Sequence, residues 1–117
     1  MNIEELTRAI EASLIVPAGK SDLQIARVYG AQAMSDLIAN AGSDTLLITS
    51  LSNAQLIRVA ELMDVPAVCL VDTQEPASEL VELARRTGTA LLLSRADFVS
   101  TYARAAACLS AKRAEAR

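Results

Sequence analysis

The residues whose types could bind a ligand lie in four short segments, each of which follows an apolar run. Residues 49–53 carry three hydroxyl side chains and an asparagine, whereas residues 30–32, 72–74 and 94–97 add small, acidic and basic residues. Ligands of open parallel sheets bind at the carboxyl ends of the strands, so these segments are the predicted contacts. The candidate ligand-binding residues are Gly30, Ala31, Thr49, Ser50, Ser52, Asn53, Asp72 and Ser94.

Residues 49–53 have two interpretations. The segment opens a predicted helix, whose free backbone N–H groups and dipole favour an anion. The other interpretation is that Ser52 or Asn53 only caps this helix, because both side chains can accept hydrogen bonds from the first turn. The sequence leaves both open. Asp97, which precedes another predicted helix, is expected to act as an N-cap.

The chain offers no group suited to general acid–base catalysis at neutral pH. It contains no histidine, the commonest general base and metal ligand, so a serine nucleophile has no base to activate it. Asp72 lacks the acidic cluster and the lysine that a phosphoacceptor site needs at the other strand ends. Cys69 and Cys108 are not in a metal-like spacing. We therefore expect a protein that is not an enzyme, with no catalytic residue, no metal site and no cofactor.

The triplet Gly19-Lys20-Ser21 resembles the end of a phosphate-binding P-loop. The complete motif requires a second glycine five positions before Gly19, where this chain has Leu14. It also requires a helix after the triplet, whereas the residues from 23 to 29 have a strand-like pattern. We therefore interpret the triplet as a turn.

Length and composition indicate one globular domain. The chain has 117 residues, of which 52% are hydrophobic and 21% charged, and its net charge is −3. The basic residues are scattered, which argues against a nucleic-acid-binding surface. The acidic N-terminus lacks the apolar core of a signal peptide, and no apolar run approaches the roughly 20 residues of a membrane span. We expect a cytoplasmic protein with no nucleic-acid partner and no membrane partner.

Apolar runs and helical spacings alternate along the chain. A helix is predicted at residues 2–12, and strands are predicted at residues 14–16, 25–30, 45–49, 67–71 and 90–93. The centres of the last three strands recur about every 22 residues, the spacing of strand–helix–strand units. Uninterrupted apolar strands are typical of a parallel sheet that is covered on both faces. The predicted fold is a three-layer α/β/α domain with a mostly parallel sheet of four or five strands.

Helical spacing predicts which side chains of the later helices face the core. Gly42 and Gly88 are expected to end two of these helices, and Pro76 to lie in a first turn. The stripe is lost near residue 111, so the predicted domain is residues 1–110, followed by a frayed tail at 111–117. The inward-facing residues are Met34, Leu37, Ile38 and Ala41; Leu56, Val59, Ala60 and Met63; Ala77, Leu80, Val81 and Ala84; and Phe98, Tyr102, Ala105, Ala106 and Leu109.

The order of these elements and several residues within them resemble the DRTGG domain family. The similarity covers residues 14–105. At about residues 28–32, where the family has the motif that names it, this chain shares only the small residues Gly30 and Ala31. The other shared features are Ser-Asp-Leu at residues 35–37, a strand that ends in Ile48-Thr49, a helix that opens with Asn53, a turn with Glu75-Pro76, and a helix that ends near Gly88.

This resemblance implies a regulatory or assembly role. Domains of the family occur inside larger proteins, including phosphotransacetylases and inorganic pyrophosphatases with CBS domains, where they are not the catalytic part. Short stand-alone chains of this kind are also similar to the N-terminal, non-catalytic part of HPr kinase. In the pyrophosphatases these domains help to form the dimer, and adenine nucleotides regulate through the adjoining CBS domains.

Two functions follow from the residues and the resemblance together. The first is a non-catalytic, homodimeric regulatory module that senses a small anionic ligand such as an adenine nucleotide. The alternative is an assembly subunit that docks on a larger metabolic enzyme without a ligand, with Ile57 and Leu83 as exposed apolar contacts. A homodimer is expected in both cases, because a small sheet must protect its edges and symmetric pairing is the common solution.

Overall fold

Helices and strands alternate along the chain except at residues 13–30, where two strands follow one another. The computed structural model describes residues 1–19 and 23–115. In order, the elements are α1 (Ile3–Ala9), β1 (Ser13–Val16), β2 (Arg27–Gly30), α2 (Met34–Asn40), β3 (Thr45–Thr49), α3 (Ala54–Leu62), β4 (Ala67–Leu70), α4 (Ser78–Thr87), β5 (Ala90–Leu93) and α5 (Phe98–Glu115). The last helix continues past residue 110, and the fraying of this tail stays a prediction.

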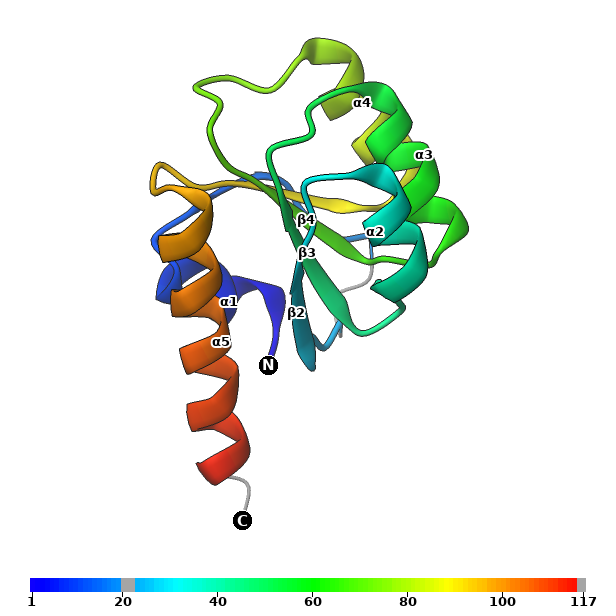
Figure 1. Ribbon diagram of the computed structural model, residues 1–117. Helices are drawn as coiled ribbons and strands as arrows, with labels where there is room; N and C mark the ends of the chain where they lie inside the picture. Colours follow the sequence, from blue (N-terminus) through cyan, green and yellow to red (C-terminus); the bar gives the residue numbers. More distant parts are fainter. Residues whose placement is uncertain (20–22, 116–117) are drawn as a thin grey trace.

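The five strands form one sheet in the order β1-β5-β4-β3-β2 (Figure 1). Strands β2 to β5 run parallel to one another, and β1 pairs antiparallel with β5. Strand β2 lies at one edge of the sheet, where β3 is its one neighbouring strand among the described residues. The predicted α/β class with a mostly parallel sheet is confirmed.

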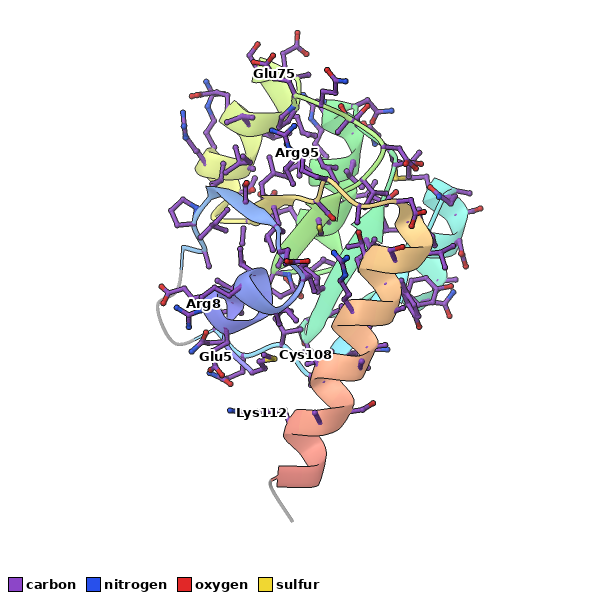
Figure 2. All side chains as sticks on the ribbon, turned by 90° about the vertical axis from the view of Figure 1, so that its left-hand side faces the viewer. Glu5, Arg8, Glu75, Arg95, Cys108 and Lys112 are labelled. Atoms are coloured by element: carbon purple, nitrogen blue, oxygen red, sulfur yellow. The ribbon has the colours of Figure 1, made fainter. Side chains whose placement is uncertain are left out.

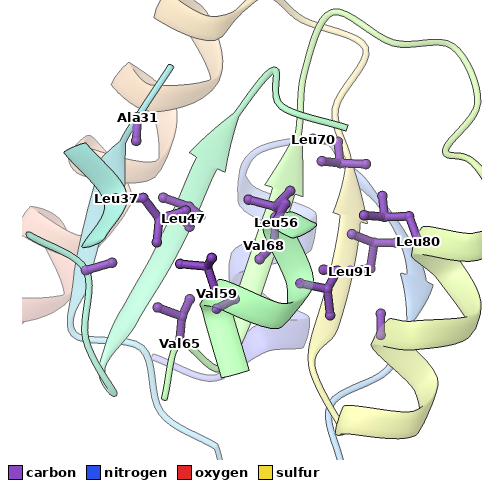
Figure 3. Close-up of a cluster of buried hydrophobic side chains, with 14 of the residues drawn as sticks. Ala31, Leu37, Leu47, Leu56, Val59, Val65, Val68, Leu70, Leu80 and Leu91 are labelled. Atoms are coloured by element: carbon purple, nitrogen blue, oxygen red, sulfur yellow. The ribbon is translucent and has the colours of Figure 1, made fainter. Parts of the chain in front are cut away.

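Helices cover both faces of the sheet (Figure 1). On one face α2, α3 and α4 bury Leu37, Leu56 and Leu80 (Figure 3). On the other face α1 and α5 bury Leu6 and Ala105. Successive side chains of a strand point to opposite faces, so every residue of β3, β4 and β5 is buried. This is the reason that these strands are uninterrupted apolar runs in the sequence.

The predicted cap at Gly88 is confirmed, and the one at Gly42 is wrong. Gly88 follows α4 with φ 74°, the left-handed conformation that glycine adopts without a steric cost. After α2, Ala41 is extended, with φ −82° and ψ 154°, so no left-handed residue ends this helix. Gly42 instead donates its N–H to Thr45 Oγ1 at 3.2 Å, in the turn that leads into β3.

The start of α4 differs from the prediction as well. Its first helical residue is Ser78, and Ala77 is the extended N-cap. Pro76 therefore lies before the helix and not in its first turn, and Ala77 is exposed instead of facing the core. The reason is that the chain leaves β4 through an extended loop and enters the helix two residues later than the proline suggests.

Three side chains lie differently from their predicted positions. Ile38 is 49% exposed and Tyr102 is 39% exposed, although both were predicted to face the core. In α5 the buried position is taken by Thr101, whose hydroxyl is paired with Ser94. Ile57, which was expected on the surface, is fully buried because α3 packs against α4. Leu83, the other expected apolar contact, is half-buried.

Candidate ligand-binding crevice

The connections of the sheet change sides between β4 and β5. After β2, β3 and β4 the chain passes to α2, α3 and α4 on one face, whereas after β5 it passes to α5 on the opposite face. The loops that leave two neighbouring parallel strands in opposite directions separate and open a crevice at their carboxyl ends. Topology therefore places the best candidate site at the ends of β4 and β5.

A cavity of about 470 Å³ lies at this position. Its volume falls in the range of small-molecule sites, which is about 300–1,000 Å³. The cavity brings together two of the four predicted segments, and the two predicted residues in it are Asp72 and Ser94. The lining residues are Asp72, Thr73, Gln74, Ser94, Arg95, Ala96 and Asp97.

Ser94 fixes the beginning of the loop between β5 and α5. Its backbone N–H donates to the Leu70 carbonyl oxygen at 3.0 Å, which continues the ladder between β4 and β5. Its hydroxyl is buried, lies 2.7 Å from the Thr101 hydroxyl and accepts the Ala96 N–H at 3.2 Å. Because these hydrogen bonds use the Ser94 hydroxyl, its role is to hold the loop in place.

Asp97 is the N-cap of α5, as predicted. Its carboxylate accepts the Ser100 N–H at 2.7 Å, and this hydrogen bond holds the pKa of Asp97 below its usual range. The carboxylate is therefore ionised at neutral pH and already bonded to the first turn of the helix.

Arg95 is the cation of the crevice. It is exposed and takes part in none of the ion pairs of the described residues. Figure 2 shows Arg95 near the same end of the molecule as Glu75, far from the end that carries Glu5 and Lys112. Arg95 is not among the ligand contacts predicted from the sequence. The available signal was that Arg95 is the only basic residue in the four segments at the strand ends.

Asp72 turns the chain out of the sheet directly after β4. Its φ is 58°, a left-handed conformation that aspartate adopts more easily than branched residues do. The side chain is exposed, and no hydrogen bond or ion pair engages its carboxylate within the described residues. The carboxylate is thus free to accept hydrogen bonds from a ligand in the crevice.

The remaining candidate residues have structural roles or lie outside the cavity. The Asn53 side chain accepts the Leu56 N–H at 3.2 Å and so caps α3, and Thr49 Oγ1 accepts the Leu51 N–H at 3.1 Å. Ser50 is exposed, and both its N–H and its hydroxyl bond to the Gln32 side chain, which joins two of the predicted segments. Ser52 is exposed without a hydrogen bond to any described residue. The capping interpretation of Asn53 therefore has direct geometric support.

Gly30 and Ala31 belong to the packing of β2. Ala31 is buried and donates its N–H to the Ile48 carbonyl oxygen at 2.9 Å. A Cβ at Gly30 would lie 2.5 Å from Phe98 Cζ and 3.2 Å from Tyr102 Cδ2. Tyr29, the residue before Gly30, donates its hydroxyl to Asp36 Oδ1 at 2.6 Å, which raises the pKa of Tyr29. Phe98 and Tyr102 thus pack beside Gly30 on the face covered by α5, whereas the Tyr29 side chain lies on the opposite face.

A larger cavity of about 530 Å³ lies at the opposite, amino-terminal ends of the strands. It is lined partly by Glu61 and Asp64, and the described part of its lining contains no lysine or arginine. Two carboxylates without a cation disfavour an anion, so we place the candidate site in the smaller cavity. Lys20 and Ser21, which complete the Gly-Lys-Ser triplet after Gly19, lie outside the described residues.

Cys69 lies in the core of the sheet. Burial raises the pKa of the Cys69 thiol to about 12, so this cysteine is not a thiolate nucleophile. The described residues contain no group of three or more potential metal ligands. No helix in this part of the chain has both the length and the apolar character that crossing a membrane requires.

Comparisons with known proteins show the fold. No protein-family model matches the sequence. No curated protein matches it either. Among solved structures, one that is similar is the crystal structure of the CBS and DRTGG domains of the regulatory region of Clostridium perfringens pyrophosphatase, complexed with the activator diadenosine tetraphosphate. The TM-score is 0.75 at 12% sequence identity, and the match covers 89% of this chain and 45% of that chain. This chain thus spans less than half of the regulatory region that it resembles.

Proposed function

We propose that this chain is a non-catalytic, homodimeric regulatory module that binds an adenine nucleotide in the crevice at the ends of β4 and β5. The observation that carries the proposal is the position of Arg95. An exposed guanidinium without an ion-pair partner among the described residues lies where the topology opens the sheet. A planar guanidinium binds a phosphate through two parallel hydrogen bonds.

The mixed charge of the crevice favours a nucleotide over a simple anion. Asp97 is bonded to the first turn of α5, which leaves Arg95 and Asp72 for a ligand. A carboxylate at a strand end is suited to accept hydrogen bonds from ribose hydroxyls, as in dinucleotide-binding sheets. A ligand with a phosphate and a sugar offers an anionic group to Arg95 and hydroxyl donors to Asp72. Inorganic phosphate has only the anionic group and would be repelled by Asp72.

The fold comparison supports a regulatory role. The solved structure is the regulatory region of a pyrophosphatase in complex with a nucleotide activator, and this chain matches 45% of it. Its resemblance to this chain is one of backbone fold, at 12% identity. The proposal therefore takes the class of ligand from that protein and the position of the site from the residues of this one.

The second candidate function is an assembly subunit that docks on a larger enzyme without a ligand. One observation bears on it: Leu62 at the end of α3 is 80% exposed and offers an apolar contact to a partner. Under this function neither the wild-type chain nor the variants of the crevice bind a nucleotide.

Isothermal titration calorimetry with AMP, ATP and diadenosine tetraphosphate tests the proposal. We expect at least one nucleotide to bind, and we expect Arg95→Gln to weaken its binding roughly ten- to hundredfold, the cost of a charge-assisted phosphate contact. The matched control is Arg58→Gln, because Arg58 is exposed on α3 and forms none of the ion pairs of the described residues. The control should leave the affinity unchanged.

Asp72→Asn separates the two halves of the ligand. We expect this variant to bind the nucleotide more weakly. Its affinity for inorganic phosphate, which is weak in the wild type, should stay the same or increase. Absence of heat for all three nucleotides, with the wild-type chain folded, would overturn the proposed ligand and favour the assembly subunit. Equal losses of nucleotide affinity in Arg95→Gln and Arg58→Gln would show that the nucleotide binds outside the crevice.

A further inference from the structure

The two edges of the sheet are unequally protected. β1 carries a register shift between Leu14 and Val16, and Pro17 follows it directly. Bulges and prolines are the devices by which proteins prevent an edge strand from pairing with another chain. β2 pairs with β3 in an unbroken register and contains no proline. The charge of its one basic residue, Arg27, is engaged within the chain by Asp44 at 2.9 Å.

The free hydrogen-bonding groups of β2 can be assigned from its pairing. Arg27 donates its N–H to the Asp44 carbonyl oxygen, and Ala31 donates to the Ile48 carbonyl oxygen, so these residues face β3. The backbone groups of successive residues in a strand point to opposite sides. Val28 and Gly30 therefore direct their N–H and C=O groups away from β3, toward the open edge.

Between Val99 and Ser110, the flank of α5 beside this edge consists of uncharged residues. Val99 is 73% exposed, Tyr102 lies next to Gly30, and Ala106 and Ser110 continue the same side of the helix at spacings of three and four residues. The opposite flank contains Arg104, which forms an ion pair with a residue that follows α1. A second copy would thus meet uncharged residues on the α5 side of this edge, while on the other side the Asp36 carboxylate is bonded to the Tyr29 hydroxyl.

We infer that the β2 edge pairs antiparallel with the β2 edge of a second copy, about a twofold axis at Tyr29. In this register Val28 lies opposite Gly30 of the second copy, so that the outward groups of both residues exchange hydrogen bonds on either side of the axis. Tyr29 then lies opposite its own counterpart as a non-hydrogen-bonded pair. The strand is thus self-complementary, and the pairing joins two five-stranded sheets into one. This inference rests on the proposed homodimer and specifies its surface.

Cysteine cross-linking tests the register. The Cα atoms of a non-hydrogen-bonded antiparallel pair are about 4.5 Å apart, within the span of a disulfide. Tyr29→Cys, in a Cys108→Ser background, should therefore give a disulfide-linked dimer on mild oxidation. The matched control is Val28→Cys in the same background. The two Val28 positions are offset by two residues along the strands, about 7 Å, so they should not cross-link.

Light scattering at micromolar concentration provides the second measurement. Wild type is expected to be a dimer, and Val28→Pro is expected to be a folded monomer, because proline removes an outward N–H that β3 does not use. If Tyr29→Cys does not fold, the state of Val28→Pro decides: a monomer supports the β2 surface, and a dimer overturns it.

The outcomes separate this surface from the proposed function. A wild-type dimer without the Tyr29→Cys cross-link would overturn the β2 pairing and leave the homodimer standing. A wild-type monomer would overturn both the pairing and the homodimer, while nucleotide binding by the monomer would preserve the proposed ligand.

Discussion

At the scale of single residues, Gly30 illustrates how the absence of a side chain positions a helix. The Phe98 ring occupies the space that a Cβ at Gly30 would need, with a separation of only 2.5 Å. The start of α5 can therefore lie directly on the carboxyl end of β2. Since α5 begins beside the crevice, this contact also fixes the helix start that follows the loop carrying Arg95. Gly30, one of the predicted ligand contacts, thus also serves as a spacer in this packing.

We expect Gly30→Ala to lower the free energy of unfolding by about 1–3 kcal/mol, the usual cost of overpacking. Urea denaturation monitored by circular dichroism measures this change. Gly42→Ala is the matched control, because its Cβ would meet only the flexible end of Arg27, at 3.2 Å, and it should stay within about 0.5 kcal/mol of wild type. Adding Phe98→Leu to Gly30→Ala should cost less than the sum of the two single changes. Equal effects of the two glycine variants would contradict this account.

At the scale of the elements, the start of α3 decides between capping and ligand binding. Asn53 has the extended conformation of an N-cap, with φ −99° and ψ 163°, and its side chain accepts the Leu56 N–H. The loop before it is tied to the β2–α2 loop through the bonds between Ser50 and Gln32. These bonds use the Leu56 N–H and the Ser50 donors that an anion would otherwise engage. The crevice between β4 and β5 retains unengaged groups instead.

Asn53→Ala is expected to lower the free energy of unfolding by about 1 kcal/mol, because one N–H of the first turn of α3 loses its acceptor. The same variant should bind nucleotide with unchanged affinity in calorimetry. Ser52→Ala, one residue earlier and without a hydrogen bond to any described residue, should change neither quantity. If Asn53→Ala loses more free energy of nucleotide binding than free energy of unfolding, this loop contacts the ligand.

At the scale of the whole molecule, the two helical layers differ in extent. α5 continues to Glu115, beyond the predicted domain end, and its last turns leave the body of the protein (Figure 1). Lys112 reaches back to Glu5 at 3.3 Å, and both side chains are partly exposed. Exposed ion pairs of this kind contribute about 0–1 kcal/mol. The main core and the proposed dimer surface lie before residue 111.

Truncation after Ser110 is therefore expected to leave a folded dimer whose free energy of unfolding is lower by at most about 1 kcal/mol. Denaturation and light scattering of the shortened chain check both parts. Lys112→Ala in the full-length chain is the control, and its effect should be of similar size. A shortened chain that is unfolded or monomeric would show that the end of α5 belongs to the domain.

The sequence alone determined the class of the fold and several local features. Residues 45–49, 67–71 and 90–93 are predicted as buried strands because a strand covered on both faces needs apolar side chains at every position. Gly88 as a helix end, Asp97 as an N-cap and Asn53 as a potential cap also follow from neighbouring residues. The misplaced inward residues, Ile38 and Tyr102, show the limit of helical spacing, which gives the side of a helix and not the width of its contact.

The tertiary structure decided which strand ends meet and which edge stays open. Strand order, the antiparallel position of β1 and the change of side after β5 depend on contacts between residues far apart in the sequence, which no local pattern encodes. Only this order joins residues 72–74 to residues 94–97, gives Arg95 a cavity and leaves β2 with one neighbour. The local sequence determines which side chains follow each strand. The pairing of distant strands determines which of them face a ligand or a second copy.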